Sequence, residues 1–287
     1  MIALALPGNE AFAAGLGVPV HPVEVHTFPD GESRVRVDAP VAGEDVVVVC
    51  TLDRPDPKLL ALLFAVQAAR DGGARRVRLV APYLCYMRQD RAFHPGEAVS
   101  AQVVARLLDR EIDGLVTVDP HLHRIPRLDA LYRTPSRVVH AAPVLSAWIR
   151  ANVAAPIIIG PDEESAQWAE EVARGAGAPA TVLRKTRRGD RDVDVTVPEL
   201  GRWQGRTPVL VDDIVSTAHT LAAAASHLRA AGAPAPVCAV VHALFAPGAD
   251  AALQGAGVAR LVSCNTVPHA TNALDIAPAV AAALKGW

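Results

Sequence analysis

The sequence predicts an α/β protein with two tandem domains, each a mostly parallel β-sheet flanked by helices. Residues 46–77 and 209–237 carry this prediction. Each stretch runs from an apolar strand through a loop and a helix, ended by glycine, into a second apolar strand. Strand–helix–strand units of this kind build right-handed parallel sheets. The length of 287 residues also suggests about two domains.

Strands and helices alternate along the first half of the chain. Short apolar runs predict the strands, Ser100 is a typical helix cap, and Gly72-Gly73 is a typical helix end. The expected strands are 2–6, 20–25, 33–37, 45–50, 77–81 and 115–118, and the expected helices are 10–15, 59–71 and 100–108. Residues 124–141 are predicted to form a loop-rich connection, which places the domain boundary near Ala141.

The second half follows the same plan. Its expected strands are 157–159, 181–183, 193–197, 209–211, 237–241 and 260–264, and its expected helices are 143–151, 166–174, 221–230 and 277–284. The domains are therefore predicted at residues 1–141 and 142–287, with the terminal helix able to pack back on the first domain.

Composition and charge narrow the class of protein. The chain is 51% hydrophobic with a formal net charge of −2, so its charge does not predict a nucleic-acid surface. No apolar run approaches the roughly 18 residues of a membrane-spanning helix, and the N-terminus lacks the basic start of a signal peptide. The four cysteines are far apart and mostly inside apolar runs, which favours reduced core residues over a disulfide framework. We expect a cytoplasmic protein with no nucleic-acid or membrane partner.

The stretch 207–225 carries the most specific chemistry. A short apolar strand ends in Asp212 and Asp213, and a hydroxyl-rich loop then leads into a helix near Leu221. Ligands of open α/β sheets bind at the carboxyl ends of strands, and a helix N-terminus suits a phosphate. Although an N-cap and a turn can have the same residue types, the order of these features favours a sugar-phosphate site.

A turn near the N-terminus places an aromatic ring beside carboxylates. Phe28 lies in a polar turn, with Asp30 and Glu32 next to it. One interpretation is an ordinary Asp-Gly hairpin whose returning strand is 33–37. The other makes Phe28 a stacking platform for a base, with the carboxylates near ribose or ammonium groups. The residues alone leave both interpretations open.

Two strand ends in the first domain carry charged or metal-binding residue types. Arg88 and Arg91 follow strand 77–81 and could clamp a polyphosphate in the bidentate geometry of guanidinium groups, although exposed arginines are more often simply solvated. Asp119 and His121 follow strand 115–118 and could reach one hard cation or its water shell. Zinc is less favoured because no thiolate is nearby.

Two strand ends in the second domain carry opposite charges. An acidic turn that contains Asp162 follows strand 157–159. A basic run, residues 184–191, follows strand 181–183, and we expect it to be a mobile loop. Mobile cations beside an anionic site are a means of closing over phosphates.

Taken in order, these motifs resemble the ribose-phosphate diphosphokinase family over roughly residues 1–287. The stretch at 212–220 resembles the motif that binds phosphoribosyl diphosphate (PRPP), and the Lys-Thr-Arg at 185–187 resembles the archaeal type of the family. The other matching motifs are Phe-Pro-Asp-Gly-Glu at 28–32, Pro-Tyr-x-x-Tyr-x-Arg-Gln-Asp-Arg at 82–91, Glu-Ala-Val-Ser-Ala at 97–101, Asp-Pro-His at 119–121, Pro-Asp at 161–162 and Asn-Thr at 265–266.

The resemblance implies two phosphoribosyltransferase-like domains, the first for ATP and the second for ribose 5-phosphate. It implies transfer of the diphosphoryl group of MgATP to the anomeric hydroxyl of ribose 5-phosphate, which gives PRPP and AMP. It implies a homo-oligomer, because the ATP-binding hairpin typically comes from a neighbouring subunit. The implied residues are Lys185 and Arg187 for catalysis; Phe28, Asp30, Glu32, Arg88, Gln89, Asp90 and Arg91 for ATP; Asp212, Asp213, Ser216, Thr217, Ala218, His219 and Thr220 for ribose 5-phosphate; and Asp119, His121 and Asp162 for Mg²⁺.

The sequence departs from the family pattern in the sugar-phosphate loop. Ala218 and His219 stand where the motif usually has two glycines, and Ser216 stands where many members have Asp. Alanine suits such a loop if its φ is negative, and His219 must point outward or add a contact of its own.

Two alternative functions compete with the synthetase. One is a phosphoribosyltransferase that uses PRPP, which predicts neither the motif at 28–32 nor that at 82–91. The other is a non-catalytic, regulatory homologue, which predicts loss of Lys185 or of the Asp119–His121 pair, and both are present.

Overall fold

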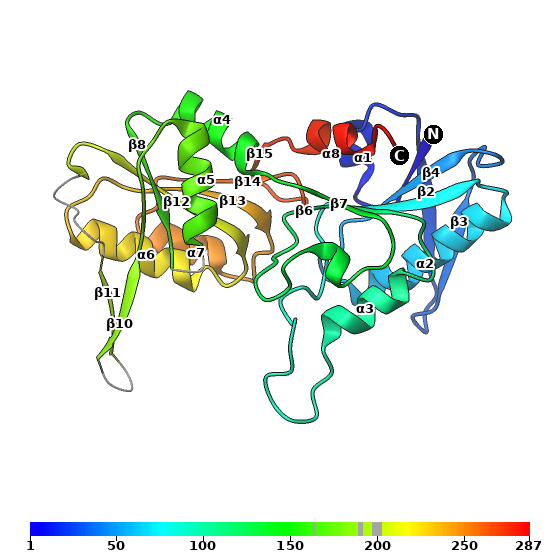
Figure 1. Ribbon diagram of the computed structural model, residues 1–287, viewed down its shortest axis with the longest axis horizontal. Helices are drawn as coiled ribbons and strands as arrows, with labels where there is room; N and C mark the ends of the chain where they lie inside the picture. Colours follow the sequence, from blue (N-terminus) through cyan, green and yellow to red (C-terminus); the bar gives the residue numbers. More distant parts are fainter. Residues whose placement is uncertain (163–164, 189–191, 197–202) are drawn as a thin grey trace. The chain divides into compact units, whose positions relative to one another are not determined.

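The structure is a computed structural model that describes residues 1–162, 165–188, 192–196 and 203–287. The chain divides into two units (Figure 1). Unit 1 comprises Met1–His140, Thr266–Pro268 and Ile276–Trp287, and unit 2 comprises Ala141–Asn265 and His269–Asp275. The C-terminal segment therefore belongs to the same unit as the N-terminal half.

Unit 1 is built on a seven-stranded sheet in the order β3-β2-β1-β4-β5-β6-β7. Neighbouring strands are parallel except in the β2–β3 hairpin, which is antiparallel. Three of the interior strands, β1, β4 and β6, are buried along their whole length, as expected for apolar runs covered on both faces. The strands are β1 (Ile2–Ala5), β2 (Val20–Thr27), β3 (Ser33–Val37), β4 (Asp45–Val49), β5 (Arg76–Ala81), β6 (Leu115–Val118) and β7 (Ser136–Val139).

Helices cover both faces of this sheet. The chain steps from β1 to β2 in one direction but from β4 through β5 to β6 in the other, so right-handed crossovers place α1 on one face and α2 and α3 on the opposite face. The C-terminal helix α8 packs on β6 and β7. The helices are α1 (Glu10–Ala14), α2 (Asp56–Asp71), α3 (Ser100–Leu108), the 3-10 turn η1 (Leu128–Ala130) and α8 (Ala277–Leu284).

The last residue of the chain anchors α8 to unit 1. The Trp287 ring contacts two guanidinium groups, with its centroid 5.4 Å from Arg78 Cζ and 4.7 Å from Arg137 Cζ. Arg137 also donates to the carbonyl oxygens of Lys285 and Gly286, each at 3.2 Å. A Cβ on Gly114 would lie 2.4 Å from the ring of Trp287, so glycine leaves the space that the indole fills.

Unit 2 is built on a six-stranded parallel sheet in the order β15-β14-β13-β12-β8-β9. A separate antiparallel hairpin, β10–β11, adds two strands. The strands are β8 (Pro156–Gly160), β9 (Ala180–Val182), β10 (Arg184–Arg188), β11 (Asp192–Thr196), β12 (Thr207–Val215), β13 (Val237–Ala243), β14 (Arg260–Cys264) and β15 (Asn272–Leu274). The helices are α4 (Ala142–Asn152), α5 (Ala166–Ala176), α6 (His219–Ala230) and α7 (Ala249–Gly255).

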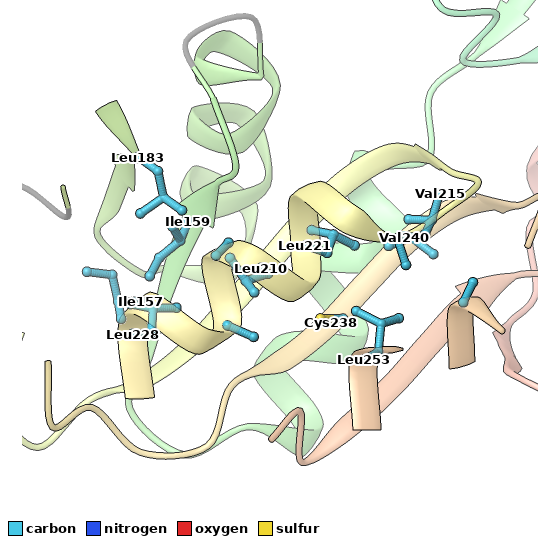
Figure 2. Packing of buried hydrophobic residues seen from close by; sticks show 14 residues of the cluster. Ile157, Ile159, Leu183, Leu210, Val215, Leu221, Leu228, Cys238, Val240 and Leu253 are labelled. Carbon is cyan, nitrogen blue, oxygen red and sulfur yellow. The ribbon is translucent and has the colours of Figure 1, made fainter. Parts of the chain in front are cut away.

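A buried apolar cluster fixes α6 against this sheet (Figure 2). Leu221 and Leu228, seven residues apart on one helix face, point toward Leu210 of β12 and its neighbours. Leu253 of α7 packs into the same cluster. Only three residues separate the end of β12 from the start of α6. The packing of α6 on the sheet therefore also positions this short loop.

Three sequence expectations differ from the structure. The basic run is expected to be a mobile loop, but residues 184–188 form strand β10, which pairs antiparallel with β11 in a hairpin. Residues 189–191 lie outside the described residues. The strand expected at 209–211 is longer, so Asp212 and Asp213 lie within β12 rather than after it. The connection expected at 124–141 contains β7, whose four residues are too few to give a clear strand pattern.

Other expectations on this level agree with the structure. The two strand–helix–strand units are present as β4–α2–β5 and β12–α6–β13, each with parallel neighbouring strands. The four cysteines all lie in the described part of the chain, are buried and form no disulfide. Among the described helices, none has both the length and the apolar composition needed to cross a bilayer.

Candidate active site

Three carboxylates gather at the carboxyl edge of the unit 2 sheet. Asp212 and Asp213 lie on β12, and Asp162 lies two residues beyond the end of β8, the parallel neighbour of β12. Burial raises the pKa of Asp212 well above its ordinary value, and the charges of Asp213 and Asp162 raise it further. A group in this position favours a proton, a cation or a ligand hydroxyl beside it.

Local hydrogen bonds hold this carboxylate cluster in place. The backbone N–H of Asp213 donates to Asp212 Oδ1 at 3.0 Å, and the N–H of Ile214 donates to Asp213 Oδ1 at 2.8 Å. Ser165 donates its backbone N–H to Asp162 Oδ1 at 3.2 Å and its hydroxyl to the Asp162 carbonyl at 2.7 Å. A Cβ on Gly160 would lie 2.4 Å from Ser165 Oγ, so glycine at the end of β8 makes this tight turn possible.

The loop after β12 leads directly into a helix N-terminus. Ser216 and Thr217 precede α6, which begins at His219 and runs for 12 residues. Ala218 has φ 61° and ψ 4°, so the condition of a negative φ is not met and alanine adopts the left-handed conformation that glycine adopts readily. The Ala218 methyl is buried in the same apolar cluster as Leu221, while His219 is exposed. Ala218 therefore replaces glycine at the cost of a strained backbone, and His219 replaces glycine with a side chain that is exposed.

The β2–β3 hairpin of unit 1 presents Phe28 to solvent. The backbone N–H of Phe28 donates to the Glu32 carbonyl at 2.8 Å, and the N–H of Glu32 donates to Asp30 Oδ1 at 3.1 Å. The Phe28 ring is 40% exposed and meets the His26 ring edge to face at 4.7 Å. Single exposed apolar side chains are common on protein surfaces, so this exposure is compatible with both the plain hairpin and the stacking interpretation.

The segment after β5 holds its polar residues in different ways. Asp90 pairs with Arg124, with Nη1 3.1 Å from Oδ1, and Gln89 contacts the Ser100 hydroxyl at the start of α3. Arg91 lies over the Phe93 ring at 5.0 Å. Arg88 is exposed. Thus Gln89 and Asp90 fix the segment while the two guanidinium groups lie on its outer side.

Asp119 and His121 lie in a strained turn at the end of β6. Asp119 has φ 29° and His121 has φ 56°, both unusual for residues other than glycine. The backbone N–H of His121 donates to the Asp119 carbonyl at 2.8 Å. The Asp119 carboxylate is nearly buried and meets the His140 ring, with Oδ1 2.9 Å from Nδ1. Non-glycine residues with positive φ are concentrated at functional sites.

Two histidines near this turn, His123 and His140, were not assigned a role from the sequence. His140 directly follows β7, and because Val118 pairs with Val139 in register, it stands beside Asp119 across the two strands. The His123 ring meets the His121 ring edge to face at 4.2 Å. A polar residue directly after the apolar Val138-Val139 was the available signal for His140.

Lys185 and Arg187 lie on β10, where their backbones pair with Val195 and Val193 of β11. The structure thus places both on one strand of a hairpin that lies outside the main sheet of unit 2. Their side chains lie outside what the structure describes.

Both halves of the chain match family models. Residues 8–111 match the N-terminal domain of ribose phosphate pyrophosphokinase, and residues 128–278 match the phosphoribosyl transferase domain. These matches define the class as a two-domain α/β protein of the phosphoribosyltransferase type.

Whole-chain relatives define the family. The ribose-phosphate pyrophosphokinase of Methanopyrus kandleri is 36% identical over 95% of this chain and 93% of its own length, and that of Halobacterium salinarum is 36% identical over 96% and 95%. The crystal structure of phosphoribosylpyrophosphate synthetase from Mycobacterium smegmatis matches with a TM-score of 0.85 and 27% identity, over 98% of this chain and 97% of that one. The chain belongs to the ribose-phosphate pyrophosphokinase family, as the motifs of the sequence predicted.

Proposed function

We propose that the chain transfers the diphosphoryl group of MgATP to the anomeric hydroxyl of ribose 5-phosphate, giving PRPP and AMP. Family membership supports the reaction. The observation that carries the assignment of the sugar site is the juxtaposition, within unit 2, of the Asp212–Asp213 pair and the α6 N-terminus. One edge of one sheet thus offers carboxylates for ribose hydroxyls and helix N–H groups for a phosphate.

Ribose 5-phosphate binds in the loop that joins β12 to α6. Asp212 and Asp213 accept hydrogen bonds from the ribose hydroxyls. The loop hydroxyls and the first N–H groups of α6 donate to the phosphate, which the positive end of the helix also favours. The residues of this site are Asp212, Asp213, Ser216, Thr217, Ala218, His219 and Thr220.

ATP binds through residues of unit 1. The exposed Phe28 ring stacks on the base, and Arg88 and Arg91 pair with phosphate oxygens. Asp30 and Glu32 contact the nucleotide from the hairpin, while Gln89 and Asp90 support the arginine segment through Ser100 and Arg124.

Lys185 and Arg187 stabilise the charge of the group in transfer. Phosphoryl-type transfer depends on alignment and charge neutralisation rather than on a covalent intermediate. Two cations on one strand of the β10–β11 hairpin supply positive charge without belonging to either binding motif.

Mg²⁺ is the metal that this chemistry requires, and the residues present fit it. The raised pKa of Asp212 beside two further carboxylates shows a concentration of negative charge that a dication would relieve. Asp119 and His121 in unit 1 would hold one Mg²⁺, directly or through its water shell, and Asp162 in unit 2 would hold a second cation. When bound, the metal neutralises phosphate oxygens.

The oligomeric state, location and partners of the protein are proposed on the same grounds. We propose a homo-oligomer in which the β2–β3 hairpin of one subunit serves the ATP site of a neighbour, because the Phe28 ring remains exposed on its own unit. We propose a cytoplasmic location, which is consistent with four buried, unbridged cysteines. Neither nucleic acid nor a membrane is among the proposed partners.

The two binding sites are tested by comparing two variants in calorimetric titrations. Asp213→Asn should weaken ribose 5-phosphate binding and leave ATP binding unchanged, whereas Phe28→Ala should weaken ATP binding, by roughly 1–3 kcal/mol for a lost stacking ring, and leave the sugar phosphate unchanged. Asp250→Asn, an exposed carboxylate on α7, is the matched control. If both variants weakened both ligands equally, the division of the substrates between the two units would be wrong.

A further inference from the structure

The segment that follows β13 is hydrogen bonded to the loop between β12 and α6. The N–H of Leu244 donates to the Val215 carbonyl at 2.9 Å, and the N–H of Ala246 donates to the Ser216 carbonyl at 3.1 Å. Val215 is the last residue of β12, and Ser216 is the first residue of the loop. One segment, residues 244–246, thus holds two successive carbonyls at the start of the sugar-phosphate loop, and we call it the brace.

These bonds fix the direction of two N–H groups of the loop. No peptide bond in the described chain is cis, and in a trans peptide the carbonyl and the N–H point in opposite directions. The N–H groups of Ser216 and Thr217 belong to the same peptides as the two braced carbonyls, so they point away from the brace. No described residue accepts a hydrogen bond from either group. Successive N–H groups that precede a left-handed residue, here Ala218, form a concavity that suits an anion.

Phe245 is the side chain that anchors the brace. It lies between the two donating residues, is partly buried, and packs on the apolar cluster that contains Val215 and Leu221 (Figure 2). Its ring also contacts the His269 ring, with the centroids 4.7 Å apart and the planes inclined at 59°. Because Phe245 lies between the two donors in the chain, a shift of its ring would move both N–H groups.

The His269 ring is itself held by hydrogen bonds. The Thr271 N–H donates to His269 Nδ1 at 3.2 Å, and the Thr271 hydroxyl lies 2.9 Å from the same nitrogen. The His269 N–H donates to Asn272 Oδ1 at 3.0 Å, and the Asn272 amide donates to the Cys264 carbonyl at 2.8 Å. Since Cys264 is a buried residue of β14, these bonds tie the ring that contacts Phe245 to the sheet of unit 2.

We infer that Phe245 is a positioning residue for the binding of ribose 5-phosphate. It holds the brace, the brace fixes the loop carbonyls, and the N–H groups of Ser216 and Thr217 therefore face the phosphate. The same contacts help to keep Ala218 in its left-handed conformation, since such strain persists only where the surroundings fix it. His269 supports Phe245 through the ring contact. The inference rests on the proposed sugar-phosphate site and adds residues that lie outside the PRPP-binding motif.

The alternative is that Phe245 is only one more apolar side chain of the core. Leu261 of β14 is the matched comparison, because it is also partly buried against the same cluster but lies outside the brace. Truncation of either side chain removes apolar packing and lowers stability. Core packing alone therefore predicts that Phe245→Ala and Leu261→Ala affect ligand binding equally.

The test is calorimetric titration of the full chain with ribose 5-phosphate and, separately, with ATP, at a temperature where each variant is folded. Phe245→Ala should weaken ribose 5-phosphate binding on the order of tenfold, because two hydrogen bonds to a charged group lose their alignment. Leu261→Ala should bind it like the parent. ATP binding should be unchanged in both variants, since the proposed ATP residues lie in unit 1. If Phe245→Ala does not fold, His269→Ala carries the same comparison, with an expected loss on the order of threefold.

Hydrogen exchange of the ligand-free chain gives a second measurement. Relative to the N–H groups of β13, those of Leu244 and Ala246 should exchange on the order of tenfold faster in Phe245→Ala than in the parent, and at the parental rate in Leu261→Ala.

Equal ribose 5-phosphate affinity in the position-245 and position-261 variants, or unchanged exchange of the two N–H groups in Phe245→Ala, would overturn the inference. For His269→Ala the overturning result is the parental affinity. When the parent binds ribose 5-phosphate, either outcome leaves the proposed sugar site standing. A parent that binds no ribose 5-phosphate would refute that site, and this inference with it.

Discussion

At the scale of single residues, Ala218 shows how the sugar-phosphate loop tolerates a side chain where the family motif usually has glycine. Its left-handed backbone costs roughly 1–2 kcal/mol for a residue with a Cβ. Its methyl group is buried, which returns about 0.8 kcal/mol. Alanine also avoids the chain entropy that glycine would lose, roughly 0.5–1 kcal/mol. These contributions nearly cancel, so the substitution is close to neutral in stability.

Ala218→Gly should therefore change the free energy of unfolding by less than about 1 kcal/mol. Ala225→Gly is the matched control, because Ala225 is buried in the same cluster but lies inside α6. That control should cost roughly 1–2 kcal/mol through lost helix propensity and a lost methyl. Urea unfolding of both variants checks this. Equal losses in the two variants would mean that Ala218 is not strained.

Asp212 predicts an unusual dependence of stability on pH. Its folded-state pKa is raised, first by burial and then by Asp213 and Asp162, so the folded state holds the proton more tightly than the unfolded chain. The resulting stabilisation is complete below the ordinary carboxyl pKa of about 4 and is lost as pH rises through the raised value. Asp212→Asn, which stays neutral, should have a flatter profile and a higher unfolding midpoint at pH 8 without ligand.

The comparison is made by thermal unfolding of parent and variant between pH 4 and pH 8, with Asp250→Asn as the exposed control. That control should follow the parent at every pH. Parallel profiles for the parent and Asp212→Asn would show that the Asp212 carboxyl is not the group responsible.

At the scale of elements, the β10–β11 hairpin carries two cations that the binding motifs do not include. Lys185→Ala should lower kcat by two or more decades and leave the KM for ATP nearly unchanged, because an interaction made only in the transition state raises kcat alone. Lys285→Ala, an exposed lysine after α8, is the control and should behave like the parent. Steady-state kinetics with both substrates checks this, and a variant as active as the parent contradicts the assignment.

The C-terminal helix is the second element with a prediction of its own. Burial lowers the pKa of the Arg78 guanidinium, which lies against the Trp287 ring together with Arg137. Trp287→Ala should lower the free energy of unfolding of unit 1 by roughly 1–3 kcal/mol, since half-buried aromatic packing and cation–π contacts are lost together. Trp287→Phe keeps a ring and should lose less. Hydrogen exchange on β6 and β7 measures the effect, and equal protection in all three proteins would rule it out.

At the scale of the whole molecule, the elements that could be predicted from the sequence were those with clear apolar runs or with glycine and other turn residues at their ends. The two strand–helix–strand units and the hairpin at residues 28–32 followed from apolar runs and turn residues. The short elements β7, α7 and β15 did not, because three to seven residues give too little pattern. The basic run was expected to be a loop because of its charge, whereas residues 184–188 pair with β11 as a strand.

In the candidate site, too, some features could be predicted from the sequence and others could not. Residue types and order were enough to single out Asp212, Asp213 and the loop that follows. The left-handed conformation of Ala218 and the contact of His140 with Asp119 depend on tertiary packing and on strand register, which spacing along the chain does not contain. His123 lies just beyond the Asp-Pro-His motif at 119–121, and its ring contact with His121 could not be read from the spacing.

The most direct test of the central claim is AMP formation from MgATP by the purified chain, with and without ribose 5-phosphate, with the phosphorus products followed by NMR. The account predicts AMP and PRPP in equal amounts only when ribose 5-phosphate is present, and neither product from Asp213→Asn at the same substrate concentrations. AMP formation that does not depend on ribose 5-phosphate, or release of ADP in place of AMP, would contradict it.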